Sequence, residues 1–419
     1  MSDRIVFTEN EPQQVSPEDA ADILASVEEL RRILKPRLKQ VEQSGNSLTL
    51  RNLVGSVRLP SGRVLEVNPK VLVDDTWAES VVQLIDDSTR IAVTGSQRSQ
   101  QSPSRNDLTT AIAYEYARRL ELALRREGPI QVFERHNVTS GRLNGRLDVT
   151  RWVRSSILNP TKFPVARDEF TVANDFSRGL SVVSGYFRRS VSDPGLSSRL
   201  RRLETDIVPG HALTSFVDSA VANRQLPAQW AKYGPSWDIA AAVLKNRSVI
   251  GDPGHTVGLE VAVEPWQLLE TLLERTLKAV AEKDDFTFEV VEKTTHALLY
   301  QEQEAMQWVI PDGVLKRDGK VVATFEAKYT NPGQLPADNH IYQAITAARA
   351  LGSPLSIIVY PAKAPPQVFE VAGGQTPSRL VTLGLDLFGY RRDGGTSYRA
   401  AILIQLLNKL ERQSALPVR

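Results

Sequence analysis

The chain has 419 residues, a formal net charge of +2 and no cysteine. Its length exceeds that of a typical single core, so two or three domains are expected. The near balance of charge excludes an overall polyanion-binding surface, so contact with nucleic acid must come from a local basic patch or a partner. The lack of cysteine excludes disulfides, thiolate metal sites and cysteine catalysis. The N-terminus has no apolar signal core and no run of about 18 apolar residues occurs, which predicts a soluble, cytoplasmic protein without membrane contact.

Residues 1–110 predict a mixed, β-rich N-terminal domain. The stretch RIVFT at 4–8 predicts a short strand, and Ser16 followed by Pro17 supplies the N-cap and first residue of an amphipathic helix. Residues 48–71 alternate apolar and polar side chains about a Pro-Ser-Gly turn. This alternation predicts a hairpin or part of a small barrel.

Residues 111–255 predict a mainly helical middle region. Just before it, residues 95–107 are rich in Ser, Gln and Arg and predict a mobile loop. The segment 108–128 predicts a strong amphipathic helix that ends at its glycine, and the pattern from about 165 to 250 is mostly helical.

The pattern changes after the Gly-Asp-Pro-Gly stretch at 251–254. Residues 256–365 predict a mixed α/β core, which a strand and a helix within 366–419 complete. Its apolar runs are typical of a sheet that is covered on both faces. The predicted order is a helix at 265–283, strands at 286–293, 306–315 and 321–329, a helix at 339–351 and a strand at 353–361.

Charged residues occur inside the apolar stretch PDGVLKRDGKVVATFEAKYTN at 311–331. Glu326 and Lys328 are two residues apart on a predicted strand and therefore project to the same face. Asp312 ends the neighbouring strand and can reach the same edge of the sheet, and Glu270 on the preceding helix is a plausible third carboxylate. Carboxylates suit a hard divalent cation, and a lysine can position water or stabilise charge developing on a phosphate.

This spacing is the PD-(D/E)xK nuclease pattern, although the pattern alone is equally compatible with a surface turn and an edge-strand ion pair. Its context favours the nuclease interpretation. The carboxylates lie at the ends of apolar strands, a glutamate-bearing helix precedes them, and Gln343 lies near the start of a helix where many such nucleases have a glutamine. Buried charges without partners are costly, and a shared metal would explain why they converge.

The ordered set of landmarks resembles the McrC family, the nuclease subunits of McrBC-type modification-dependent restriction systems. The resemblance covers nearly the whole chain and rests on segments in this order: RIVFTENEPQQVSPEDAADIL, LRNLVGSVRLPSGRVLEVNPKV, GRLNGRLDV, DEFTVANDFSRGL, YGPSWDIAAAVL, PWQLLETLLERTL, PDGVL, FEAKY and IYQA.

The resemblance implies a multidomain α+β fold whose C-terminal part is a restriction-endonuclease-like mixed sheet flanked by helices. It implies a DNA endonuclease that depends on Mg²⁺, or on Mn²⁺ in its place, and cuts modified double-stranded DNA within a complex with a McrB-like AAA+ GTPase ring. The N-terminal part would stimulate that partner. The implied catalytic residues are Asp312, Glu326, Lys328, Glu270 and Gln343, and the implied metal ligands are Asp312, Glu326 and Glu270.

Two departures from the family pattern concern Glu270 and Gln343 more than Glu326 and Lys328. The helix reads Leu-Leu-Glu where Phe-Glu is common, and Thr346 stands where an aromatic residue is expected. The chain has no Walker G-x-x-x-x-G-K-[ST] loop, so we expect it to bind no nucleotide alone. The alternative function is a non-cleaving adaptor that only activates an AAA+ motor, but an adaptor has no need to hold three charged groups together.

Other polar side chains have structural interpretations. The histidines lack metal-binding spacing and are expected to be structural or exposed, with only His340 retained as an active-site neighbour. Three acids, at 168, 169 and 175, are expected to cap helices and form ion pairs. The four arginines between 142 and 154 either contact phosphates, reach a partner's nucleotide or form a solvated face, and the last is favoured for most of them. We expect these arginines and the hairpin at 48–71 to face the ring. The residues are His136, His211, His255, His296 and His340; Asp168, Glu169 and Asp175; and Arg142, Arg146, Arg151 and Arg154.

Overall fold

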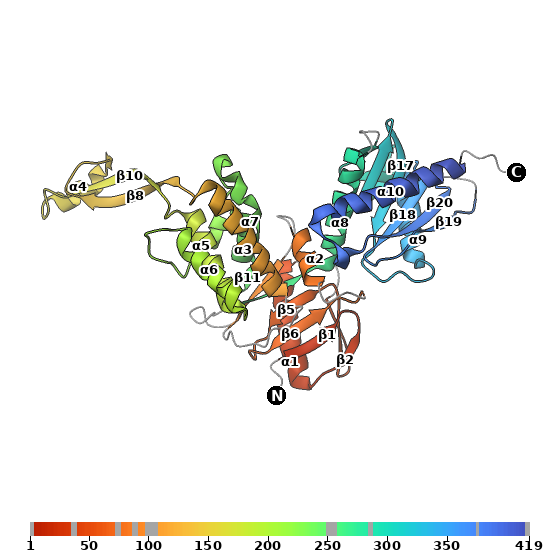
Figure 1. Cartoon of the computed structure of the whole chain (residues 1–419), viewed down its shortest axis with the longest axis horizontal. Coiled ribbons are helices and arrows are strands. Elements are labelled where there is room, and N and C mark those ends of the chain that lie inside the picture. The colour runs from red at the N-terminus through yellow and green to blue at the C-terminus, as the bar shows by residue number, and fades with distance from the viewer. Residues whose placement is uncertain are drawn as a thin grey trace.

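The computed structural model describes residues 4–34, 40–71, 77–85, 91–96, 108–248, 258–283, 288–373 and 377–414. They form an N-terminal module at the base, a helical module with a projecting ribbon on one side, and a C-terminal domain on the other (Figure 1). This is the multidomain α+β fold that the sequence predicts. Most of the predicted loop, residues 97–107, and the Gly-Asp-Pro-Gly stretch lie outside the described residues. None of the helices within the described ranges is long and apolar enough to cross a bilayer.

The N-terminal module consists of two sheets and the helices α1 and α2. The larger sheet has the strand order β1-β6-β5-β12-β7-β11, and the smaller has β2-β4-β3. The hydroxyl of Ser16 accepts a hydrogen bond of 3.1 Å from the Asp19 N–H, so it caps helix α1 as predicted. The elements are β1 (Arg4–Thr8), β2 (Pro12–Gln14), α1 (Pro17–Leu34), β3 (Val41–Ser44), β4 (Ser47–Leu50), β5 (Val54–Arg58), β6 (Val64–Asn68), α2 (Trp77–Leu84), β7 (Ile91–Ser96), β11 (Arg247–Ser248) and β12 (Gly258–Val263).

Strand β12 enters this sheet from a distant part of the chain. It pairs antiparallel with β5 on one side and with β7 on the other. Gly55 allows the close approach, because its φ is +115° and a Cβ there would lie 2.4 Å from the carbonyl oxygen of Val261. Residues 258–263 are therefore part of the N-terminal sheet, although the sequence assigned them to the core at 256–365.

The helical module packs four α-helices and two short 3-10 helices on one another and on the N-terminal sheet. Helix α3 ends at Gly128, as predicted, where φ is +72°. Its buried Tyr116 donates a hydrogen bond of 2.7 Å to the Leu180 carbonyl and so ties α3 to α5. The elements are α3 (Leu108–Glu127), α5 (Asp175–Ser190), α6 (Pro194–Asp206), η1 (Ser219–Asn223), η2 (Ala228–Tyr233) and α7 (Gly234–Asn246).

An antiparallel ribbon projects from the helical module, and Figure 1 shows it extending away from the rest of the molecule. Strand β8 (Val132–Ser140) pairs with β10 (Phe163–Thr171), and its tip holds β9 (Arg146–Leu147) and helix α4 (Val149–Ser156). The helical pattern predicted from residue 165 onward is wrong for the first residues of that range. Only residues near the start of β10 are buried, and most of the others are exposed. The strand therefore lacks the alternation of apolar and polar residues that would have identified it.

The C-terminal domain is a mixed six-stranded sheet with helices on both faces. Its strand order is β13-β16-β17-β18-β20-β19, with parallel pairs between β17, β18 and β20. Alternate residues of β18 belong to different cores: Ile357 packs in the main core, which includes residues of α8 and α10, and Ile358 packs with Ala344 of α9. The elements are α8 (Pro265–Lys283), β13 (Phe288–Val291), β16 (Gly313–Arg317), β17 (Lys320–Ala327), α9 (Asp338–Ala350), β18 (Leu355–Tyr360), β19 (Gln367–Glu370), β20 (Arg379–Gly384), η3 (Leu387–Gly389) and α10 (Arg392–Ser414).

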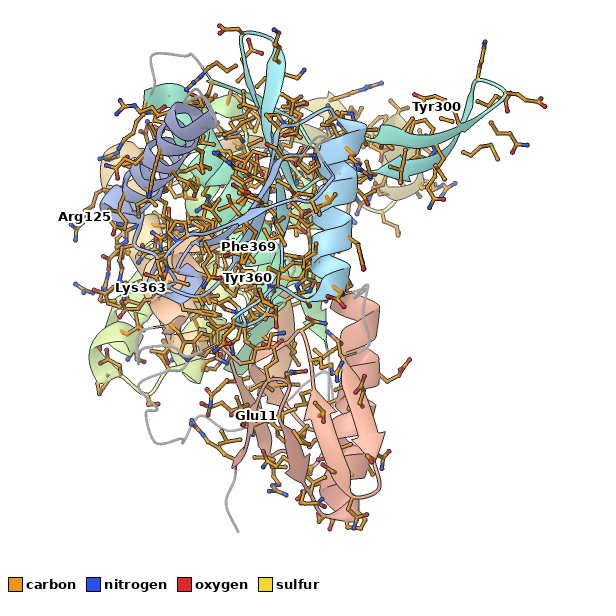
Figure 2. The ribbon with its side chains drawn as sticks, turned by 90° about the vertical axis from the view of Figure 1, so that its right-hand side faces the viewer. Glu11, Arg125, Tyr300, Tyr360, Lys363 and Phe369 are labelled. Carbon is orange, nitrogen blue, oxygen red and sulfur yellow. The ribbon has the colours of Figure 1, made fainter. Side chains whose placement is uncertain are left out.

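A hairpin interrupts this domain between its first two sheet strands. Strands β14 (His296–Gln301) and β15 (Glu304–Val309) pair only with each other among the described strands, and Figure 2 shows the hairpin projecting with Tyr300 near its end. The sequence predicted one strand across 306–315. The structure divides it, because the chain leaves β15 at Val309 and enters β16 at Gly313. Asp312 thus lies directly before β16, at one end of an internal strand of the main sheet.

Candidate active site

Asp312 and Glu326 are brought together by the pairing of β16 with β17. The antiparallel register aligns Gly313 with Phe325, so Asp312 lies opposite Glu326. The Asp312 N–H donates to the Phe325 carbonyl at 3.0 Å, and Oδ2 of Asp312 accepts from the Ala327 N–H at 2.8 Å. Two hydrogen bonds to β17 therefore fix Asp312 beside Glu326.

Glu326 is a buried carboxylate with one partner and one free oxygen. Its exposed fraction is only 4%. Oε1 accepts a hydrogen bond of 2.7 Å from Lys328 Nζ, whereas the buried Oε2 has no hydrogen-bond partner. Burial, together with the negative charge of Asp312, raises the pKa of Glu326 to about 7. The site thus holds a carboxylate whose second oxygen is available to a cation.

Lys328 connects Glu326 to helix α9. Its ammonium lies 2.7 Å from Glu326 Oε1 and also 2.7 Å from Oε1 of Gln343. The backbone N–H of Lys328 donates to the Val359 carbonyl at 2.8 Å, which anchors the lysine to β18 just after β17 ends. His340, one turn before Gln343, has its pKa lowered by burial and by the positive charge of Lys328. The structure therefore places His340 near Lys328.

Lys293 is the residue of this site that sequence reasoning missed. Its ammonium lies 2.6 Å from Glu270 Oε2 and 2.9 Å from Asp312 Oδ1. Burial alone would lower the pKa of Lys293, but the charges of Asp312 and Glu270 outweigh that effect and raise it. The signal available in the sequence was a lysine at the end of the strand predicted at 286–293. Its role depends on the β13–β16 register, which pairs Val291 with Val314 and brings Lys293 to Asp312.

The donor set fits a hard divalent cation at two carboxylates. Asp312 and Glu326 supply oxygen donors, and the unpartnered Oε2 of buried Glu326 is a group that a cation would satisfy. Glu270 is joined to Asp312 through Lys293. In the part of the chain that the structure describes, no three His, Cys, Asp or Glu side chains are close enough together to hold one metal ion. A cavity of about 800 Å³ between α8 and β13 reaches Glu270, Lys293 and Asp312.

The acidic residues of the ribbon region form ion pairs, as predicted, but they do not cap helices, since two lie within β10 and the N-cap of α5 is Asn174. Asp168 pairs with Arg135 at 3.2 Å, Glu169 with Arg167 at 3.1 Å and Asp175 with Arg224 at 2.7 Å. Among the histidines, His296 contacts Thr294 at 3.0 Å, and His255 lies outside the described residues. The remaining two are His136 in β8 and His211 after α6.

The four predicted arginines lie at the tip of the ribbon, and all four are exposed. They share this tip with large exposed apolar side chains, among them Ile157 and Leu158 at 86% and 83% exposure. The hairpin at 48–71 differs, because β5 is buried along its whole length between β6 and β12. The expectation that this hairpin faces a partner is therefore wrong for β5, since it has no free surface to offer.

Comparisons with known proteins agree with this architecture. The family described as "McrBC 5-methylcytosine restriction system component" matches residues 48–361. A chain of a Thermococcus gammatolerans structure, described as a refined half-complex from a tetradecameric assembly of McrB AAA+ hexamers with bound McrC, superposes with a TM-score of 0.64. It is 15% identical, and the match covers 96% of this chain and 100% of that one. At such identity the likeness shows the fold.

A second structure, of the Thermococcus gammatolerans McrBC complex, matches with a TM-score of 0.45 and 15% identity over 66% of this chain and 88% of that one. No curated protein matches the sequence. Because the family match spans most of the chain, the chain belongs to the McrBC family of 5-methylcytosine restriction system components.

Proposed function

We propose that this chain is the Mg²⁺-dependent DNA endonuclease subunit of a McrBC-like restriction complex that defends against foreign DNA. The observation that carries the proposal is the buried Glu326 beside Asp312, with one oxygen bound to Lys328 and the other without a partner. A carboxylate of this kind is costly in a metal-free structural role, because its burial leaves a polar atom unsatisfied. Family membership supports a restriction-system role.

In this mechanism Asp312 and Glu326 would supply the oxygen ligands of the cation. When bound, Mg²⁺ would stabilise charge on the scissile phosphate as a Lewis acid, and Mn²⁺ shares its preference for carboxylates. The ammonium of Lys328 lies beside Glu326, where it can stabilise negative charge that develops on the phosphate during attack by water. Gln343 also holds that ammonium, which donates to its Oε1 at 2.7 Å. Lys293 neutralises the repulsion between Glu270 and Asp312.

We also propose that the chain acts with an AAA+ GTPase ring of McrB type and stimulates its nucleotide hydrolysis. The structurally similar chain comes from an assembly of McrB AAA+ hexamers with bound McrC. On the present chain the ribbon tip is the surface best suited to such a partner, because helix α4 has no buried residue and its neighbours Ile157 and Leu158 are exposed. Exposed apolar side chains beside arginines are typical of protein interfaces. DNA would reach the candidate active site through this complex.

A paired assay on the reconstituted complex tests the nuclease proposal. Asp312→Asn and Lys328→Ala should each abolish DNA cleavage, because one removes the charge of a metal ligand and the other a cation beside the phosphate. Stimulated phosphate release by the partner should persist, because β17, next to which both residues lie, is far from the ribbon tip at α4 (Figure 1). Cleavage and phosphate release are measured on the same samples.

Matched controls come from the other end of the same two strands. Asp318→Asn and Lys320→Ala change exposed residues at the β16–β17 turn and should leave both activities unchanged. The adaptor function would be favoured by a wild-type complex that stimulates hydrolysis without cutting DNA. It has one observation in its favour, since Lys293 already balances the charges of Glu270 and Asp312. Cleavage that survives in either site variant would also contradict the nuclease proposal.

A further inference from the structure

The residue after Lys328 is held by the N-terminal module. Lys70 of the N-terminal module places its ammonium 4.6 Å from the centroid of the Tyr329 ring, which also packs edge-on against Phe388 of the C-terminal domain with ring centroids 6.4 Å apart. Two residues further on, the side-chain amide of Asn331 donates a hydrogen bond of 2.9 Å to the Lys70 carbonyl. The segment 329–331 is therefore in contact with a part of the chain that follows β6.

A buried carboxylate completes this contact. Glu9, which follows β1, has an exposed fraction of 0%, and its Oε1 accepts a hydrogen bond of 2.7 Å from the Asn52 N–H. Lys70 Nζ lies 3.9 Å from the same oxygen. The Tyr329 hydroxyl is close enough to the Glu9 carboxylate that each affects the pKa of the other. In this structure neither Glu9 Oε2 nor the hydroxyl completes a hydrogen bond.

A buried contact made of three polar groups contributes little net stability to the packing of two parts of a protein. Burial raises the pKa of Glu9 and lowers that of Lys70, so each charge is desolvated at a cost. Apolar side chains of similar size would give comparable or greater stability. What the polar set provides is direction, because the Glu9 carboxylate interacts favourably with the Lys70 ammonium and the Tyr329 hydroxyl in only a few relative positions.

The position of Lys328 depends on this contact from one side and on β18 from the other. Its N–H is bonded to Val359, its carbonyl accepts from the Thr330 N–H at 2.8 Å, and the next residue is Tyr329. Glu9 and Lys70 lie at the same end of the parallel pair β1 and β6, joined by the Glu9 N–H to the Asn68 carbonyl at 2.8 Å. A shift of this sheet end would therefore move the backbone that carries Lys328.

We propose that Glu9, Lys70 and Tyr329 are positioning residues for Lys328, through which the N-terminal module sets the geometry of the candidate active site. The proposal rests on the nuclease function proposed above. Asp312 and Glu326 do not share this dependence, because hydrogen bonds between β16 and β17 fix them. Disturbing the contact should therefore impair the use of Lys328 and leave metal binding intact.

The test compares Tyr329→Phe, Glu9→Gln and the control Asp19→Asn in the full-length chain. Tyr329→Phe removes only the hydroxyl and keeps the ring, and Asp19 pairs with Arg63 within the N-terminal module. In the reconstituted complex, Tyr329→Phe and Glu9→Gln should lower kcat for DNA cleavage about tenfold, since a misplacement of about 1 Å can cost about a hundredfold and a smaller shift costs less. The KM for DNA, partner-dependent nucleotide hydrolysis, Mn²⁺ affinity by calorimetry and the unfolding temperature should match those of the wild type. Asp19→Asn should match it in every measurement.

Three outcomes overturn the proposal. A folded Tyr329→Phe variant with wild-type kcat would overturn the positioning role alone. A parallel fall in kcat, unfolding temperature and stimulated hydrolysis would show that the contact only stabilises the fold. A wild-type complex that cuts no DNA would overturn the proposed nuclease function and this inference with it. If Glu9→Gln fails to fold, the more conservative Tyr329→Phe decides the outcome.

Discussion

At the scale of a single residue, the protein environment of Glu326 and a bound cation favour opposite protonation states of its carboxyl group. Its folding environment favours the neutral carboxyl, because burial and Asp312 raise its pKa to about 7, while a cation requires the charged form. The proton must therefore leave when a metal binds. Metal binding by this site should weaken as the pH falls below about 7, since protonated Glu326 then competes with the ion.

The first prediction concerns Glu326→Gln in metal-free buffer. A raised folded-state pKa contributes stability that is complete below about pH 4.5 and is lost as the pH rises through about 7. The neutral amide avoids this loss, so the variant should exceed the wild type in free energy of unfolding at pH 8 by about 1 to 3 kcal/mol, with little difference at pH 4.5. Denaturant titrations at the two pH values measure this, with exposed Glu289→Gln on β13 as control. A variant less stable than the wild type at pH 8 would contradict the assignment.

The sequence predicted part of this site because strand periodicity is local. Alternation placed Glu326 and Lys328 on one face, and they pair at 2.7 Å. Lys293 could not be assigned in that way, since its contact with Asp312 depends on the register between β13 and β16, and register is a property of two strands. Glu270 was expected to be a direct metal ligand. The sequence pattern could not predict that the ammonium of Lys293 lies between Glu270 and Asp312.

The ribbon is the element on which a partner's binding energy would depend. Its strands pair in register from Phe163 with Ser140 to Thr171 with Val132, and the ribbon carries its tip away from the helical module (Figure 1). The strands of the ribbon were hard to predict from the sequence. Both faces of its outer part are at least partly exposed, so neither face requires the row of apolar residues that identifies a strand. By contrast, α3 and α8 were predicted well, since each buries one continuous apolar face.

The second prediction changes the ribbon tip. A double variant, Ile157→Ser with Leu158→Ser, should reduce stimulation of the partner's nucleotide hydrolysis at least tenfold, because it removes two apolar anchors from the proposed interface. The unfolding temperature should not change, since both side chains are exposed in the free chain. Phosphate release is measured against chain concentration. Leu213→Ser, at another exposed apolar position, is the control, and undiminished stimulation by the double variant would move the interface elsewhere.

At the scale of the whole molecule, helix α2 ties the parts together. It packs against α3, α8 and η3, and Trp77 lies edge-on to Phe388 with centroids 6.3 Å apart. Arg275 of α8 donates hydrogen bonds to the carbonyls of Gln83 and Leu84 at 3.0 and 3.2 Å. The helical module, N-terminal module and C-terminal domain thus share contacts, although the sequence divided the chain into consecutive ranges. The boundary predicted at 256 misses the place of β12, because pairing between distant strands leaves no local signature.

The third prediction follows from the pairing of β12 with β5 and β7. A fragment of residues 1–110 should not fold, because it lacks the strand between β5 and β7 and would expose their unpaired edges. A fragment of residues 1–264 includes β12 and should fold cooperatively. Amide dispersion in NMR spectra and thermal unfolding by circular dichroism distinguish these states. A folded 1–110 fragment would show that β12 is dispensable to the sheet.

The late arrival of β12 also has a consequence for synthesis. A ribosome must complete the ribbon and all of the helical module before it makes the strand that fills the sheet begun by the first residues. Until then β5 and β7 present open edges in a crowded cell, where they are exposed to chaperones and to one another on neighbouring chains. Ser96 and Gly258 lie opposite each other in the finished sheet. We therefore expect the yield of folded protein to depend on how quickly translation passes from the first of these residues to the second.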